Sequence, residues 1–172
     1  MIVVLLGYMG SGKSTIGRLL AKKLEFKFLD LDEYIEQNEK VSVAELFNSK
    51  GEIYFRSIEA KAVKQLCNDS DSLVLALGGG TPCFGDTMSF LNEHSNVMTF
   101  YLKASVSELT KRLVNEKSSR PLIAHLDEEA IPEFIAKHLF ERSFYYNQSK
   151  VNINTDDQSV EAIVELTRSK LV

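Results

Sequence analysis

The sequence is poor in cysteine, has no long apolar run and carries no excess of positive charge. Cys67 and Cys83 are the two cysteines among 172 residues, and they have neither metal-ligand spacing nor a paired framework. We therefore expect reduced thiols in a cytoplasmic protein. The net charge of −4 argues against nucleic-acid binding, since nucleic-acid binders usually carry a basic excess. No apolar run reaches membrane-spanning length, and the run at 2–6 lacks the preceding basic residue of a secretory signal.

The order of short apolar and longer amphipathic segments predicts one α/β domain over residues 1–172, without repeats or linkers. Five apolar segments are expected to be strands, at 2–6, 27–31, 73–77, 97–102 and 150–154. Helical patterns alternate with them, at about 13–24, 32–38, 43–49, 52–67, 84–94, 105–115, 128–147 and 157–170. This alternation predicts a three-layer α/β fold with a parallel sheet, whose ligands bind at the carboxyl ends of the strands.

Residues 7–14, GYMGSGKS, follow the first expected strand and match the phosphate-binding pattern G-x-x-x-x-G-K-[ST]. Glycines let successive backbone N–H groups surround phosphate oxygens, and the following helix adds a partial positive charge. The alternative is a glycine-rich turn with a chance lysine, which the strand–loop–helix context disfavours. We predict that nucleotide phosphates bind at Gly10, Ser11, Gly12, Lys13, Ser14 and Thr15.

The rest of the chain favours a small-molecule kinase among phosphate-loop proteins. The sequence has no N-K-x-D motif of the kind that reads guanine in GTPases. The buried run at 73–77 ends in glycines rather than in the acidic residue usual in motor and transport ATPases. A small-molecule kinase needs only a phosphate cradle, an acceptor site and a closing segment.

Asp30 and Asp32 end the second expected strand, and the period of two in a strand predicts that both carboxylates face the phosphate loop. Beside a nucleotide, one acid could hold metal-bound water and the other could accept a proton from an attacking hydroxyl. The alternative is that Asp32 only caps the helix that follows.

Two arginines are candidates for binding an anionic acceptor. Arg56 lies with Glu59 at the border of an apolar helical stripe, and Arg142 lies within an apolar helical face. Planar guanidinium groups suit a carboxylate, and the glycines at 78–80 would let a ligand approach the backbone closely. The alternatives are a surface pair for Arg56 and Glu59, and an Arg142 that extends outward to solvent.

The polar stretch 115–130, interrupted by Pro121, predicts a mobile loop between two helices. Arg120 in this loop could close over the phosphates and offset the charge of the transition state. The alternative is an exposed loop arginine without a role.

These residues together resemble the shikimate kinase family over nearly the whole length of the chain. The matching stretches are GYMGSGKSTIGRLLAKKL, FLDLDEYIE, ELFNSKGEIYFRSIE, LGGGTP, SRPLI and the arginine of ERSFYY. The resemblance implies a P-loop kinase of the nucleoside-monophosphate-kinase-like fold, with a five-stranded parallel sheet. It also implies a substrate-binding region at about 32–60 and a lid at about 112–127.

The resemblance implies that the γ-phosphoryl group of ATP passes to the 3-hydroxyl of shikimate, giving shikimate 3-phosphate and ADP. This reaction belongs to chorismate and aromatic amino-acid biosynthesis. The resemblance further implies a magnesium-dependent cytoplasmic enzyme, which we expect to be a monomer without nucleic-acid or membrane partners.

The resemblance also assigns roles to single residues. It implies catalytic roles for Lys13, Asp32 and Arg120, and a magnesium site at Ser14 and Asp30, with Asp30 acting through water. It implies adenine contact for Arg112 and phosphate contact for Arg120. The implied shikimate contacts are Asp32, Arg56, Gly78, Gly79, Gly80 and Arg142, with Phe47 and Phe55 as apolar walls.

Two other functions stay open at this point. A related kinase of another hydroxy acid, such as gluconate, would need similar arginines and a similar aspartate. A nucleotide-binding regulator without catalysis could keep the fold, although such a protein would usually have lost Lys13, Asp32 or an arginine.

Overall fold

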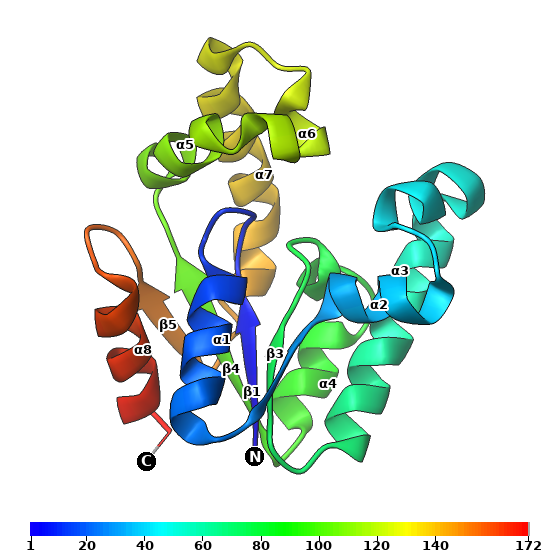
Figure 1. The fold of residues 1–172 in the computed structure, drawn as a ribbon, viewed down its shortest axis with the longest axis vertical. Helices are drawn as coiled ribbons and strands as arrows, with labels where there is room; N and C mark the ends of the chain where they lie inside the picture. Colours follow the sequence, from blue (N-terminus) through cyan, green and yellow to red (C-terminus); the bar gives the residue numbers. More distant parts are fainter. Residues whose placement is uncertain (172) are drawn as a thin grey trace.

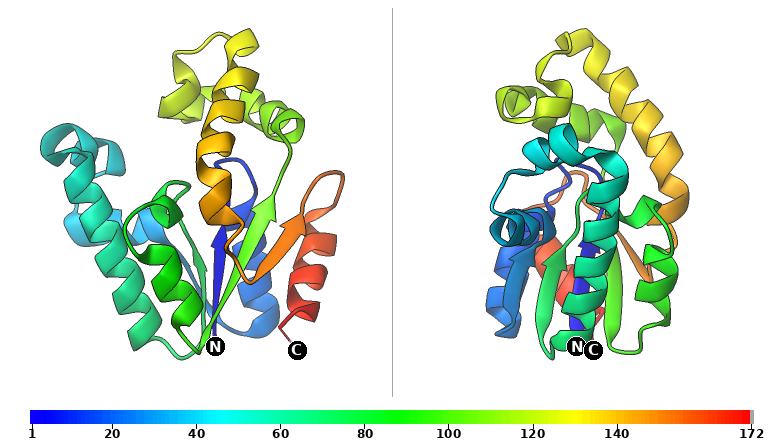
Figure 2. Two further views of the ribbon diagram at one scale, coloured as in Figure 1. Left: turned by 180° about the vertical axis from the view of Figure 1, so that it is seen from behind. Right: turned by 90° about the vertical axis from the view of Figure 1, so that its right-hand side faces the viewer.

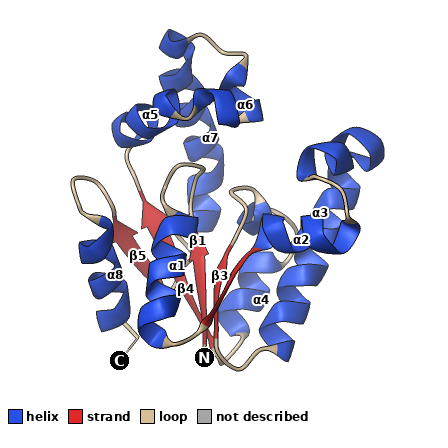
Figure 3. Ribbon diagram, in the orientation of Figure 1, coloured by secondary structure: helices blue, strands red, loops and turns tan. Residues whose placement is uncertain are grey.

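Five parallel strands form the centre of the molecule in the order β2-β3-β1-β4-β5 (Figures 1 and 3). The computed structural model describes residues 1–171. Within the sheet, Leu5 of the central strand lies between Ala76 and Phe100 of its two neighbours. The strand bounds are β1 Ile2–Leu6, β2 Lys27–Asp30, β3 Leu73–Ala76, β4 Val97–Lys103 and β5 Val151–Asn154.

Helices cover both faces of the sheet (Figures 1 and 2). The α-helices are α1 Lys13–Leu24, α2 Leu31–Glu39, α3 Val43–Asp69, α4 Thr87–Glu93, α5 Val106–Asn115, α6 Pro121–Ala124, α7 Ile131–Tyr146 and α8 Val160–Ser169. Three short 3₁₀ helices join them, η1 Thr81–Cys83, η2 Lys117–Ser119 and η3 Glu128–Ala130.

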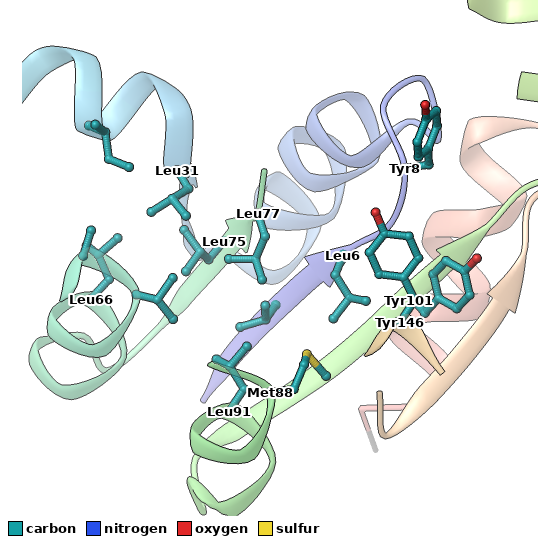
Figure 4. Packing of buried hydrophobic residues seen from close by; sticks show 14 of the residues in the cluster. Leu6, Tyr8, Leu31, Leu66, Leu75, Leu77, Met88, Leu91, Tyr101 and Tyr146 are labelled. Carbon is teal, nitrogen blue, oxygen red and sulfur yellow. The ribbon is translucent and has the colours of Figure 1, made fainter. Parts of the chain in front are cut away.

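The two faces of β1 explain why this strand has no polar residue. Val3 and Leu5 pack with α1 and α8, whereas Ile2, Val4 and Leu6 pack with the helices on the other face. All five side chains are fully buried, as expected for a parallel strand covered on both sides. Figure 4 shows the hydrophobic cluster around Ile2, Val4 and Leu6, in which Leu6 lies close to side chains from α4, β4 and α7.

The strands follow the sequence predictions within one residue at each end, whereas several predicted helices and one predicted loop differ from the structure. The helices expected at 43–49 and 52–67 form one element, α3, which is broken at Gly51 with φ 81° and ψ 172°. The helix expected from residue 84 begins only at Thr87, after η1. The stretch 115–130, expected to be a loop, contains η2, α6 and η3.

Two parts of the chain project beyond the carboxyl ends of the strands, on either side of the loop that follows β1 (Figures 1 and 2). One consists of α5, α6 and the start of α7, and the other of α2 and the first part of α3. Within residues 1–171, no helix combines the length and the apolar character that crossing a bilayer requires.

Candidate active site

The loop between β1 and α1 has the geometry of a phosphate cradle. Gly10 and Gly12 have φ of 79° and 93°, in the left-handed region that favours glycine, and Gly12 is the N-cap of α1. The Lys13 ammonium bends back over this loop and donates to the carbonyl oxygens of Gly7 and Tyr8, at 2.9 Å each. Burial lowers the pKa of Lys13 to about 8, and the nearby carboxylate of Asp32 opposes this shift.

Ser14 and Asp30 form a direct pair at the start of α1. The Ser14 hydroxyl donates to Asp30 Oδ2 at 2.6 Å. The other carboxylate oxygen of Asp30 caps α2, because it accepts from the backbone N–H of Asp32 at 3.1 Å. The N-cap role considered for Asp32 therefore belongs to Asp30.

The strand alternation predicted for Asp30 and Asp32 is wrong. The strand β2 ends at Asp30, so Asp32 lies in the first turn of α2, where a period of two does not apply. Both side chains nevertheless line one cavity, because the tight turn from strand to helix brings them to the same edge of the sheet.

That cavity has a volume of about 410 Å³ and joins the phosphate loop to the ends of β2 and β3. Most of the predicted nucleotide and acceptor residues meet on its wall. The predicted residues that line it are Gly10, Ser11, Gly12, Lys13, Ser14, Thr15, Asp30, Asp32, Gly78, Gly79, Arg112 and Arg120. The wall does not include Arg56, Gly80 or Arg142, which lie farther along the glycine stretch.

Asp32 sits in an environment that disfavours its charge. Burial is the main cause that raises its pKa to about 6, and the carboxylates of Glu59 and Asp30 raise it further. The ammonium group of Lys13 acts in the opposite direction. A carboxyl group of this pKa is poised near neutral pH, as a proton acceptor in catalysis should be.

Arg56 is bound by the buried carboxylate of Glu59, which the sequence analysis located only at the border of an apolar helical stripe. Its Nη1 donates to Glu59 Oε2 at 2.6 Å, and the Thr81 hydroxyl donates to Glu59 Oε1 at 2.6 Å. Glu59 is only 1% exposed. The guanidinium also lies 4.6 Å from the ring centre of Phe84, and its Nε is buried without a hydrogen bond. Neither Glu59 nor Thr81 was predicted as a site residue, since only the tertiary contact between α3 and η1 joins them.

The predicted apolar walls lie beside this arginine. The rings of Phe47 and Phe55 are in contact, with their centroids 4.6 Å apart, and Arg56 Cζ lies 5.8 Å and 5.5 Å from them. Phe55 is buried and Phe47 is partly buried.

The glycine stretch after β3 brings the acceptor residues together. A Cβ atom at Gly78 would lie 3.1 Å from Asp32 Oδ1, and one at Gly79 would lie 3.3 Å from Arg142 Nη1. A Cβ atom at Gly80 would lie 2.4 Å from Arg56 Nη2. Three side chains from α2, α7 and α3 thus pack against three consecutive glycines, whose lack of a Cβ lets them approach the backbone closely.

The two remaining predicted arginines extend from α5 and the segment after it. Arg120 forms two hydrogen bonds with Glu116, at 2.7 and 3.1 Å, and both side chains line the cavity. Arg112 donates to Glu108 at 2.9 Å and reaches the backbone oxygens of Gly10 and Thr155, at 3.2 and 3.4 Å. In this structure Arg112 therefore ties the phosphate loop to the end of β5.

Comparison with known proteins identifies the family. The sequence matches the model of the family described as shikimate kinase over residues 9–171. The chain belongs to the shikimate kinase family. A shikimate kinase from Flavobacterium johnsoniae is 47% identical to it over 163 residues, which cover 95% of this chain and 94% of that one.

Solved shikimate kinases share the fold. The structure from Bacteroides thetaiotaomicron aligns with a TM-score of 0.92 at 33% identity, covering 99% of this chain and 98% of that one. The shikimate kinase from Acinetobacter baumannii in complex with shikimate aligns with a TM-score of 0.86 at 29% identity, covering 99% and 92%. The predicted fold class and the predicted activity, ATP-dependent phosphorylation of shikimate in aromatic biosynthesis, are thereby confirmed.

Proposed function

We propose that this shikimate kinase carries out its reaction at the junction of the phosphate loop with the glycine stretch after β3. The observation that supports this most strongly is the convergence of Asp32, Arg56 and Arg142 on Gly78–Gly80, beside the cavity that contains Lys13. An acid for a hydroxyl and two guanidinium groups for a carboxylate match the chemistry of shikimate.

On the nucleotide side, the ammonium group of Lys13 exchanges the carbonyl oxygens of Gly7 and Tyr8 for phosphate oxygens of ATP. Arg120 exchanges Glu116 for the phosphates in the same way and offsets the charge of the transferring group. Both cations already line the cavity.

Ser14 and Asp30 fit a magnesium ion. A hydroxyl and a carboxylate oxygen at 2.6 Å are hard donors, the kind that Mg²⁺ prefers. Residues 1–171 contain no cluster of three or more acidic, histidine or cysteine side chains that could enclose a metal. This agrees with an ion that takes most of its ligands from phosphates and water. When bound, the ion supplies positive charge to the phosphates.

On the acceptor side, Arg56 and Arg142 bind the carboxylate of shikimate, and Asp32 faces its 3-hydroxyl. A bond forms between the hydroxyl oxygen and the γ-phosphorus as the bond from the γ-phosphorus to ADP breaks. The hydroxyl proton passes to the Asp32 carboxylate, which is ionised above pH 6.

An assay of ADP release with shikimate, with gluconate and without acceptor tests this function. We expect turnover with shikimate and only background release in the other two reactions. Turnover with gluconate alone would overturn the assignment of the acceptor, and no turnover with either would favour a regulator without catalysis.

We also propose that the enzyme acts as a monomer in the cytoplasm on a small molecule, without nucleic-acid or membrane partners. The net charge of −4 supports the absence of nucleic-acid partners, because nucleic-acid binders usually carry a basic excess. Light scattering of the purified protein should give the mass of one 19.4 kDa chain, and a larger mass would contradict the monomer.

A further inference from the structure

One face of α7 presents three polar side chains to the centre of the site. His138, Arg142 and Tyr146 are spaced four residues apart, so they lie above one another on the same side of the helix. Arg142 is the middle member. Within residues 1–171 it forms no ion pair with a carboxylate, unlike Arg56, Arg112 and Arg120. Its guanidinium group lies instead beside the ring of Tyr8.

Tyr8, the second residue of the phosphate loop, contacts two of these three side chains. Its hydroxyl forms a hydrogen bond with His138 Nδ1 at 3.0 Å. The face of its ring lies 5.6 Å from Arg142 Cζ, within the range of a cation–π contact. Tyr8 is only 1% exposed, which strengthens both contacts.

Tyr146 holds the other end of this face. Its hydroxyl donates to the backbone oxygen of Gly79 at 2.5 Å, and its ring is packed 5.1 Å from the ring of Tyr101 on β4. The helix is thus tied to the sheet one turn below Arg142 and to the phosphate loop one turn above it.

We propose that Tyr8 is a positioning residue for Arg142: its ring supports the guanidinium group, and its bond to His138 fixes the helix that carries it. The inference rests on the proposed role of Arg142 in binding the carboxylate of shikimate. Because Tyr8 belongs to the phosphate loop and contacts both His138 and Arg142, this one residue links the phosphate cradle to the acceptor clamp.

The first test compares Tyr8→Leu with Tyr8→Phe by calorimetric titration with shikimate. Tyr8→Leu removes the ring and the hydroxyl, and should raise the dissociation constant about five- to thirtyfold, which corresponds to about 1–2 kcal/mol. Tyr8→Phe keeps the ring and should recover most of this affinity. The KM for ATP should change less than about twofold in both, because the backbone that binds phosphate is kept.

His138→Leu provides a second test that does not alter the buried loop. His138→Leu and Tyr8→Phe break the same hydrogen bond, so each should raise the dissociation constant for shikimate by a similar small factor. The double variant should bind shikimate no more weakly than either single variant. Additive losses of affinity would contradict the hydrogen bond between Tyr8 and His138 as the shared cause. Tyr145→Leu, on the same helix but without a hydrogen bond from its hydroxyl, is the matched control and should bind shikimate normally.

The outcomes separate this inference from the proposed function. If the wild-type protein fails to bind shikimate, the proposed function fails. If it binds shikimate and Tyr8→Leu binds equally well, or loses ATP and shikimate affinity to the same extent, the positioning role of Tyr8 is overturned.

Discussion

The burial of Asp32 fits its proposed role as a base and should cost stability. Its carboxyl lies between the ammonium of Lys13 and the carboxylates of Glu59 and Asp30, and burial is the main cause that raises its pKa to about 6. As the proposed base, this carboxylate would be stronger than that of an ordinary aspartate and still mostly ionised at pH 7.

Replacing Asp32 with Asn should therefore abolish most turnover. General bases contribute about a hundredfold to ten-thousandfold to the rate, so we expect a loss of kcat in this range with ATP affinity kept. In the wild type, kcat/KM for shikimate should fall as the pH drops below about 6, because the base becomes protonated. Near-normal kcat in the variant would show that another group takes the proton.

The same substitution should stabilise the fold above pH 7. The pKa of Asp32 in the folded state lies above its ordinary value of 3.8, so the folded state binds more protons than the unfolded state between about pH 4 and pH 6. The free energy of unfolding therefore falls as the pH rises from about 4 to about 6, and above pH 6 the buried charge costs up to about 3 kcal/mol. Thermal unfolding should show Asp32→Asn melting above the wild type at pH 8 and level with it near pH 3.5. An equal difference at both pH values would point to repacking instead.

Arg142→Ala should lower the affinity for shikimate far more than the affinity for ATP. A charge-assisted contact is worth about 1.5–3 kcal/mol, or roughly ten- to a hundredfold in affinity. Separate titrations with shikimate and ADP measure this difference. An equal loss for both ligands would indicate damage to the fold rather than a missing clamp.

At the scale of elements, side chains from α2, α3 and α7 pack against the glycine stretch 78–80 that follows β3. The backbone of Gly80 has φ −90°, so alanine is allowed there without strain. Only the space is missing, since a Cβ atom would lie within 2.4 Å of the Arg56 guanidinium.

Gly80→Ala should displace Arg56 and raise the KM for shikimate about tenfold. It should also lower the melting temperature, because Glu59, only 1% exposed, loses its bond to the guanidinium group. Steady-state kinetics checks this expectation. In an Arg56→Ala background the same substitution should have no further effect. A further loss there would mean that Gly80 contacts the substrate by itself.

The lid, residues 112–127, should become ordered when both substrates bind. Its short helices carry Arg120, which is paired with Glu116 at 2.7 Å in this structure and must turn toward the phosphates. Trypsin should cut after Lys117 in the free protein, and ADP together with shikimate should slow this cut while leaving sites outside the lid unaffected. Cleavage that does not respond to either ligand would contradict closure.

At the scale of the whole molecule, local patterns were enough to predict the sheet and the phosphate loop. Buried strands without polar residues and the run GYMGSGKS depend on nearby residues, and the structure places both as expected. Arg142 was singled out by its place inside an apolar helical face, and the structure places it beside Gly79 and Tyr8 rather than on the wall of the cavity.

The contacts that support the site could not be predicted in the same way. The bonds of Glu59 with Thr81, and of Tyr8 with His138, join residues 22 and 130 positions apart. No periodic pattern records such pairs, since they depend on how helices pack across the ends of the strands. For the same reason, strand alternation gave the wrong account of Asp32, which the turn into α2 places at the cavity.

The central claim is that an alcohol and its carboxylate are held between Asp32 and two arginines beside the phosphate loop. A crystal structure of this chain with ADP and shikimate tests it most directly. It should show the carboxylate between the guanidinium groups of Arg56 and Arg142, and the 3-hydroxyl within hydrogen-bonding distance of Asp32. A shikimate molecule bound away from Gly78–Gly80, or with its carboxylate facing Asp32, would contradict the account.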